Sequence, residues 1–271
     1  MAQTCTWVGD ASANWSNDSN WHGSVEDHKK PTSVDDVVLA ANAACTVDAA
    51  SVCKSINCTG YTNTLTLGAG LTVSGSITLV SGMTFTPSTY TVTVNATSTI
   101  TSGGKSFYNF TFGATATYTL GDGLTVTNQT SFTGGTTTTL ATSDIITHDI
   151  DFLDNNSTVN GRTIYVNGDI LANASWCYGT TLIEINGTND QNYSASYMDH
   201  SVVINKTGGT LTFTQATHNF FTNTGKTFTY TQGLYDVTSN TCIIKFSNAF
   251  TIVNNGFEFY KLSFAFTGTV T

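Results

Sequence analysis

The densest group of acidic side chains in this chain begins at His148 and reads His-Asp-Ile-Asp-Phe-Leu-Asp-Asn-Asn. In an extended strand, successive side chains point to opposite faces. We therefore expect His148 and Ile150 on one face, and Asp149 and Asp151 on the other. Two carboxylates on one face are the beginning of a Ca²⁺ site, because this cation prefers carboxylate and carbonyl oxygen ligands.

Asp154 follows in the next turn and would join this candidate calcium site, the one cofactor that the sequence suggests. The order of the acidic residues, however, lacks the Asp-x-Asp-x-Asn-Gly pattern of a known calcium loop. The favoured interpretation is a strand whose Ile150 and Phe152 face inward and whose carboxylates are solvated. A catalytic role for these carboxylates is the least favoured of the three interpretations.

The six cysteines allow two interpretations. These cysteines are Cys5, Cys45, Cys53, Cys58, Cys177 and Cys242. Disulfides such as Cys53–Cys58 or Cys5–Cys45 would staple the first part of the chain. We favour small buried hydrophobic residues in strands, because Cys45 has the same strand parity as Val47. No Cys-x-x-Cys pair occurs, which argues against zinc.

The remaining polar patterns point to structure. Asp35 and Asp36 could form an acid pair, but we expect Asp35 to cap a turn and Asp36 to face water. No nucleophile elbow, phosphate loop or dinucleotide fingerprint is present. The sequence therefore predicts a protein that is not an enzyme, without catalytic or cofactor-binding residues.

The elements that position these residues are short strands. Between Ser55 and Ser143 the chain has two formal charges, Lys105 and Asp122, and threonine alternates with apolar residues throughout. Alternation with period two is typical of half-buried strands. Stacked strands bring equivalent positions to about 4.8 Å, where like charges repel and threonines pack. The pattern favours a right-handed parallel β-solenoid over its alternative, tandem β-sandwich domains.

Composition and net charge limit the classes of partner that the protein is expected to bind. Charged residues make up 10% of the 271 residues, the net charge is −9, and 53 residues are threonine. No basic patch is visible, so we expect no nucleic-acid partner. No run of eighteen apolar residues occurs, so we expect no membrane insertion. The first residues lack the features of a signal peptide, which favours a route to the cell exterior such as release of virus particles by lysis.

Two regions differ in character. Residues 1–40 hold three of the four tryptophans and many of the charges, and we interpret them as an N-terminal cap on a solenoid of residues 41–271. The last residues, in contrast, are strand-like and have no cap of their own. An uncapped end of a stack exposes backbone groups and apolar side chains. We therefore expect an interface at Phe264, Phe266 and Val270, with a homotrimer as the most plausible assembly.

Three segments carry a resemblance to a known class of proteins. They are the opening with Trp7-Val8-Gly9, Asn14-Trp15-Ser16 and Asp35-Asp36-Val37-Val38-Leu39, the stretch from Cys45-Thr46-Val47 through Gly60-Tyr61 to Leu67, and Ile185-Asn186-Gly187 with Val202–Phe213. These segments resemble the parallel β-helix repeats of large bacterial surface adhesins and of structural proteins of tailed phages. The resemblance implies a scaffold and does not imply a ligand.

The leading hypothesis is a non-enzymatic structural protein of a phage particle, either a capsid decoration protein or a fibre component. Its location would be the virion or the cell exterior, and its partners would be other copies of itself, other virion proteins or host-surface carbohydrate. Two alternatives remain open: a repeat fragment of a secreted bacterial adhesin, and a carbohydrate-active β-helix enzyme.

Overall fold

The computed structural model describes residues 1–26, 28–40, 43–133, 137–153, 157–172, 177–220, 225–237, 243–246, 250–258 and 261–264. The chain divides into two compact units. Unit 1 comprises Met1–Asn128 and Leu140–Ser143, and unit 2 comprises Gln129–Thr139 and Asp144–Thr271. Almost all regular structure in the described residues is β-strand, apart from one 3₁₀ turn at Asp18–Asn20. None of the described residues forms a helix that could cross a membrane.

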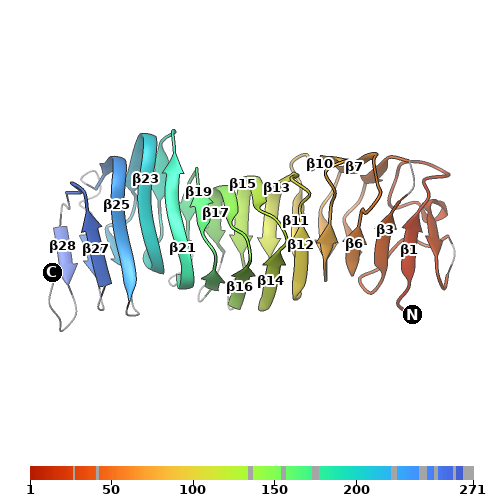
Figure 1. Ribbon diagram of the computed structural model, residues 1–271, viewed down its shortest axis with the longest axis horizontal. Coiled ribbons are helices and arrows are strands. Elements are labelled where there is room, and N and C mark those ends of the chain that lie inside the picture. The colour runs from red at the N-terminus through yellow and green to blue at the C-terminus, as the bar shows by residue number, and fades with distance from the viewer. Residues whose placement is uncertain are drawn as a thin grey trace. The chain divides into compact units, whose positions relative to one another are not determined.

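The strands of unit 1 are short. They are β1 (Thr4–Trp7), β2 (Trp21–Gly23), β3 (Asp36–Leu39), β4 (Cys45–Val47), β5 (Ser51–Cys53), β6 (Ser55–Asn57), β7 (Thr64–Leu67), β8 (Leu71–Val73), β9 (Ile77–Thr78), β10 (Thr84–Thr86), β11 (Thr91–Val94), β12 (Ser98–Thr101), β13 (Ser106–Phe112) and β14 (Ala116–Leu120). They form three parallel ladders: β1–β3–β6–β9–β12–β14, β5–β8–β11–β13 and β4–β7–β10. Successive coils thus add strands to three sides of a parallel β-solenoid (Figure 1). This parallel pairing excludes the antiparallel sheets of a β-sandwich.

The alternation predicted from the sequence is confirmed within these ladders. In β7, β8 and β11 the leucines and valines are buried, and the threonines between them are half-buried. The register places threonine on threonine across neighbouring coils, as in Thr72–Thr93–Thr111 and Thr46–Thr66–Thr86. Such columns tolerate the close stacking that would be unfavourable for like charges.

A tryptophan cluster lies at the start of unit 1. Trp7, Trp15 and Trp21 are each at most 1% exposed, and the ring of Trp21 meets those of Trp7 and Trp15 at 5.0 and 4.7 Å. β1 pairs parallel to β3 on one edge and antiparallel to β2 on the other, so its outer edge is not left open. Residues 1–40 therefore supply both the tryptophan cluster and the first rungs of a ladder, β1 and β3.

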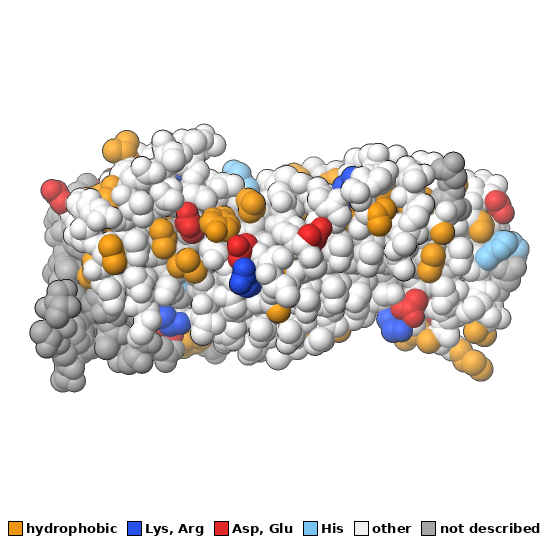
Figure 2. Space-filling model, in the orientation of Figure 1, with side chains coloured by type: hydrophobic (Ala, Val, Ile, Leu, Met, Phe, Trp, Pro, Cys, Tyr) orange, Lys and Arg blue, Asp and Glu red, His pale blue; other side chains and the backbone are white. Residues whose placement is uncertain are grey.

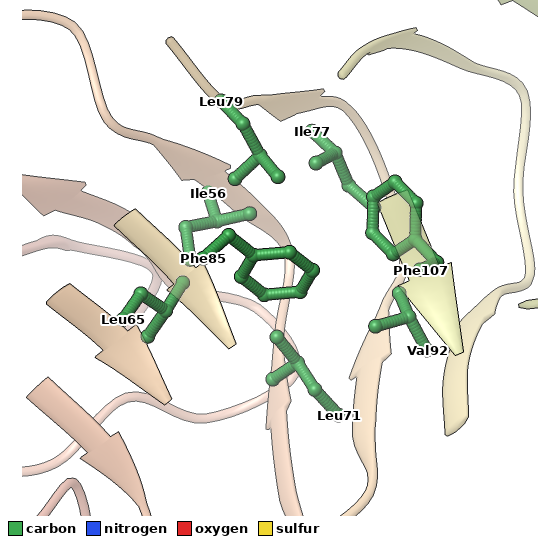
Figure 3. Close-up of a pocket in the computed structure, with 8 residues that line it drawn as sticks. All are labelled: Ile56, Leu65, Leu71, Ile77, Leu79, Phe85, Val92 and Phe107. Carbon is green, nitrogen blue, oxygen red and sulfur yellow. The ribbon is translucent and has the colours of Figure 1, made fainter. Parts of the chain in front are cut away.

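The interior of unit 1 is apolar and closely packed. Aromatic rings follow one another along Phe107, Phe110, Phe112 and Tyr118 at centroid distances of 5.0, 5.1 and 4.8 Å. Figure 3 shows a gap beside this row, lined by Ile56, Leu65, Leu71, Ile77, Leu79, Phe85, Val92 and Phe107. Its volume is about 10 Å³, and no polar side chain lines it. It is a packing defect and offers no room for a ligand.

The cysteines confirm the favoured interpretation. Cys5, Cys45, Cys53, Cys58 and Cys177 are buried and unpaired, and Cys242 lies outside the described residues. Burial raises the pKa of the Cys58 and Cys177 thiols to about 12. These thiols are therefore unreactive apolar core groups.

Unit 2 continues with longer strands. Its strands are β17 (Ile145–Phe152), β18 (Ser157–Gly161), β19 (Ile164–Val166), β20 (Ile170–Leu171), β21 (Cys177–Gly187), β22 (Gln191–Tyr193), β23 (Tyr197–Phe213), β24 (Thr217–Phe220), β25 (Lys226–Asp236), β26 (Ile243–Phe246), β27 (Phe250–Asn254) and β28 (Lys261–Phe264). The strands β15 (Leu124–Phe132) and β16 (Thr137–Ala141) contain the boundaries between the units. One parallel ladder, β17–β19–β21–β23–β25–β27, stacks Ile145, Ile164, Ile183, Val202 and Phe228 in the core.

Candidate functional site

The candidate calcium site lies at a corner of a coil rather than on one flat strand. β17 pairs with β19 through residues 145–147 and with β20 through Ile150 and Asp151. The chain bends between these two pairings, so the alternation of faces is interrupted at His148 and Asp149. The expectation that His148 and Ile150 share a face is therefore wrong: the His148 side chain is 51% exposed and Ile150 is fully buried. Ile150 and Phe152 do face inward, as the favoured interpretation expected, but its expectation of solvated carboxylates is wrong for Asp151, which is buried.

The carboxylates of this corner have separate protein partners. Asp149 Oδ1 accepts a hydrogen bond from the backbone N–H of Asp169 at 2.7 Å and lies 2.7 Å from His148 Nδ1. Asp151 is 6% exposed and accepts a hydrogen bond from Gln129 Nε2 at 3.2 Å. Asp154 lies outside the described residues. Among the residues that the structure describes, no group of three or more His, Cys, Asp or Glu side chains could hold a metal ion.

The bond from Asp149 to the next coil is one of a series in unit 2. Asp144 accepts from the N–H of Thr163 at 3.0 Å, Asp169 from Asn192 at 2.7 Å, and Asp190 from Thr210 at 2.8 Å. Each bond joins residues 19 to 23 positions apart, which is one turn of the solenoid. The donors are backbone N–H groups of the next coil, at Thr163 just before β19 and at Asn192 and Thr210 within β22 and β23. We name this series the carboxylate clamps.

Unit 1 uses acidic side chains in the same way. Asp35 accepts from the N–H of Thr32 at 2.8 Å and of Gln3 at 3.0 Å, so it caps a turn as the sequence predicted. Burial acts to raise the pKa of Asp35, but the hydrogen bonds from Thr32 and Gln3 outweigh it and hold the pKa below its usual value. Asp36 pairs with Lys54 at 2.8 Å instead of facing water alone.

Two histidines of unit 2 are buried. His200 is fully buried, and burial, together with the nearby Lys226 cation, lowers its pKa to about 3 despite a hydrogen bond with the Thr181 carbonyl. Burial likewise lowers the pKa of His218 to about 4. Both rings are neutral near pH 7 and inaccessible to a substrate. They belong to the core rather than to a catalytic site.

A surface cleft lies among the described residues of unit 1. It encloses about 280 Å³ and is lined by Trp15, Ser16, Lys30, Pro31, Thr32 and the segment 49–52. Lys30 is the one charged side chain in this lining. No acid–base pair converges there, so the cleft has none of the groups that hydrolysis of a polysaccharide requires.

The most regular exposed feature of unit 2 is the outer surface of the ladder β17–β19–β21–β23–β25–β27. Its central column, as we name it, consists of Ile146, Tyr165, Glu184, Val203, Thr229 and Val253, which the register aligns across six strands. Ile146 is 47% and Val253 41% exposed. Equivalent residues of neighbouring coils lie about 4.8 Å apart. The column thus offers a mainly apolar strip.

A second column follows two residues further along the chain in three coils, and three residues further in β25, where the register shifts. It consists of Asn167, Asn186, Asn205 and Gln232, and we name it the amide column. The register pairs Asn186 with Asn205 and Asn205 with Gln232, and Asn167 continues it by one residue beyond the pair Val166–Ile185. Asn205 Nδ2 donates to Glu184 Oε1 at 3.0 Å, and Gln232 Nε2 donates to Asn205 Oδ1 at 3.1 Å. These bonds fix the orientation of the Asn205 and Gln232 amide groups.

The amide column corresponds to a periodic signal in the sequence. An Asn follows a buried Val or Ile at positions 167, 186 and 205, that is, at intervals of 19 residues. The predicted interface is not tested by the structure. Phe264 ends β28, of which only the backbone is described, and Phe266 and Val270 lie outside the described residues.

Comparison with known proteins does not extend this description. No family model, curated protein or solved structure gives a significant match to the chain.

Proposed function

We propose that this protein is a non-enzymatic structural protein of a phage particle, a capsid decoration protein or a fibre component. Its stacked coils hold a rigid β surface at a fixed distance from the structure that carries it. The observation that carries the proposal is the use of the acidic side chains. Asp144, Asp149, Asp169 and Asp190 each clamp one coil to the next. A β-helix hydrolase would instead need such carboxylates to converge on a substrate.

The free cysteines support assembly inside a cell. Five thiols are buried and unpaired, which suits a chain that folds in a reducing compartment. A particle assembled in the host cytoplasm and released by lysis meets this condition. A secreted adhesin folds under oxidising conditions, which makes it the second choice.

We further propose that the protein assembles with itself, as a homotrimer, through its C-terminal strands. At the start of unit 1, β2 and the tryptophan cluster already cover the edge of β1, so we do not place the contact between copies there.

Particle fractionation tests the structural role. An antibody raised against the purified protein is used on density-gradient fractions of particles released by lysis of the source culture, and on the envelope fraction of the same cells. Co-sedimentation with particles is expected. Recovery in the envelope fraction alone would assign the chain to an adhesin, and release of reducing ends from polysaccharides by the purified protein would assign it to an enzyme.

A further inference from the structure

The outer surface of unit 2 has the chemical character of a binding face. Figure 2 shows the side on which β19, β21, β23 and β25 are labelled in Figure 1, and most of the side chains over these strands are uncharged. Of the central and amide columns together, Glu184 is the one member with a formal charge. This face would therefore neither attract a polyanion nor hold a strongly cationic partner.

We propose that this face binds a neutral polysaccharide chain, which lies along the central and amide columns. The inference rests on the proposed function, because it names the ligand of the surface that the solenoid would present. Sugar rings have apolar faces that pack on aromatic and aliphatic side chains. Tyr165, Val203 and Ile146 provide such contacts in the central column.

The amide column supplies the polar half of the recognition. An amide group has two N–H donors and a carbonyl with two lone pairs. Asn205 uses one donor toward Glu184 and accepts one bond from Gln232, so it keeps both a donor and an acceptor for hydroxyl groups. Because these bonds hold the amide planes of Asn205 and Gln232 in place, these two side chains lose little entropy when a ligand binds.

The spacing selects a polymer rather than a single sugar. Tyr165 with Asn167 and Val203 with Asn205 each place an apolar side chain beside an amide group. These two pairs lie two coils apart, about 9.6 Å, which is close to the length of two sugar units in an extended glycan. Every second unit can therefore meet one apolar and one amide position, and weak contacts add along the chain. A second copy of the protein would be the competing occupant of such a face.

Affinity electrophoresis of the purified full chain tests the inference. Native gels contain soluble mixed-linkage β-glucan, galactomannan or dextran, and a parallel gel contains the polyanion alginate. We expect retardation by at least one neutral polysaccharide and none by alginate. Tyr165→Ala should weaken the retarding interaction by about tenfold, the effect of losing one aromatic contact.

Tyr90→Ala is the matched control, because it removes a tyrosine that is 38% exposed on unit 1. It should bind as the wild type does. Val203→Thr, which keeps the size of the side chain and the fold, should weaken binding as well. Lack of retardation by every neutral polysaccharide, or equal loss in the Tyr90 and Tyr165 variants, would overturn the inference.

Light scattering tests whether a second copy of the protein, rather than a polysaccharide, occupies this face. If the wild type self-associates, Tyr165→Ala abolishes this association and no neutral polysaccharide binds, the face is an interface between copies and the inference is wrong. Particle fractionation remains an independent test, since a protein that binds glycan but does not co-sediment with particles would contradict only the structural role.

Discussion

His200 should make the stability of unit 2 depend on pH in a way that one substitution can reverse. The ring is fully buried, stacks on Phe152 at 5.9 Å, and has a pKa lowered from 6.5 to about 3. In the unfolded chain it titrates near pH 6.5. Below that pH the unfolded state binds a proton that the folded state cannot accept, so the folded state loses stability as the pH falls toward 3.

The magnitude follows from the pKa difference. Each pH unit below 6.5 costs about 1.4 kcal/mol per histidine, so His200 alone should lower the free energy of unfolding by about 2 kcal/mol at about pH 5. His218, whose pKa is lowered to about 4, should contribute a similar amount at that pH. Near pH 7.5 neither ring is protonated in either state, and the penalty vanishes.

The variant His200→Phe keeps a ring on Phe152 and removes the titrating group. Loss of the hydrogen bond with the Thr181 carbonyl should destabilise it by about 1 kcal/mol near pH 7.5. At about pH 5 it escapes the penalty of about 2 kcal/mol and should be more stable than the wild type. Urea unfolding followed by circular dichroism, at several pH values between these two, measures the crossing.

The matched control is Phe132→Leu, because Phe132 stacks on Phe152 at 5.7 Å and carries no titrating group. This variant should be less stable than the wild type at every pH and should keep the wild-type dependence on pH. If His200→Phe and the wild type lose stability in parallel between pH 7.5 and 5, the folded protein accepts the proton at His200, and the reasoning from burial is refuted.

Four further predictions concern other parts of the chain. Asp169→Ala removes the acceptor for the Asn192 N–H and should lower the free energy of unfolding by about 1–2 kcal/mol in urea titrations, while Asp169→Asn, which keeps an acceptor, should lower it less. Phe107→Ala, beside the gap of unit 1, should cost about 3–5 kcal/mol and abolish a stable fold at moderate urea concentrations. Cys58 and the other buried thiols should react with Ellman's reagent only in denaturant, and rapid reaction in buffer would contradict their burial. Light scattering should give a mass near three times 28.8 kDa, whereas a monomer would contradict the proposed trimer.

The fold could be predicted from the sequence because its signal is local. Alternating Leu and Thr over four residues, as in β7, is enough to predict which side chains face the core. The scarcity of charge between Ser55 and Ser143 further indicates that the strands stack in successive coils, because like charges at equivalent positions would repel. The burial of the cysteines could be predicted from the same alternation, because Cys45 and Val47 lie on the same face of their strand.

The details of the site depend on coil length, which local patterns do not give. At His148 a single strand by sequence bends to join two ladders, and strict alternation fails there. The clamp from Asp149 to the Asp169 N–H spans 20 residues and is visible only once the register is known. The amide column was within reach, because Asn167, Asn186 and Asn205 are equally spaced, but in this chain Asn-Gly is also the common signal of a turn.

The placement of charge connects the fold to the proposed function. Along a ladder, a carboxylate column at about 4.8 Å would repel itself, so carboxylates are tolerated mainly where each can bind a backbone donor of the next coil. Asp144 and Asp169 occupy such places in unit 2. The strand faces are then left to hydroxyl, amide and apolar side chains. A solenoid that stacks stably therefore presents a surface of low charge, and this surface suits a neutral, repeating ligand better than a charged one.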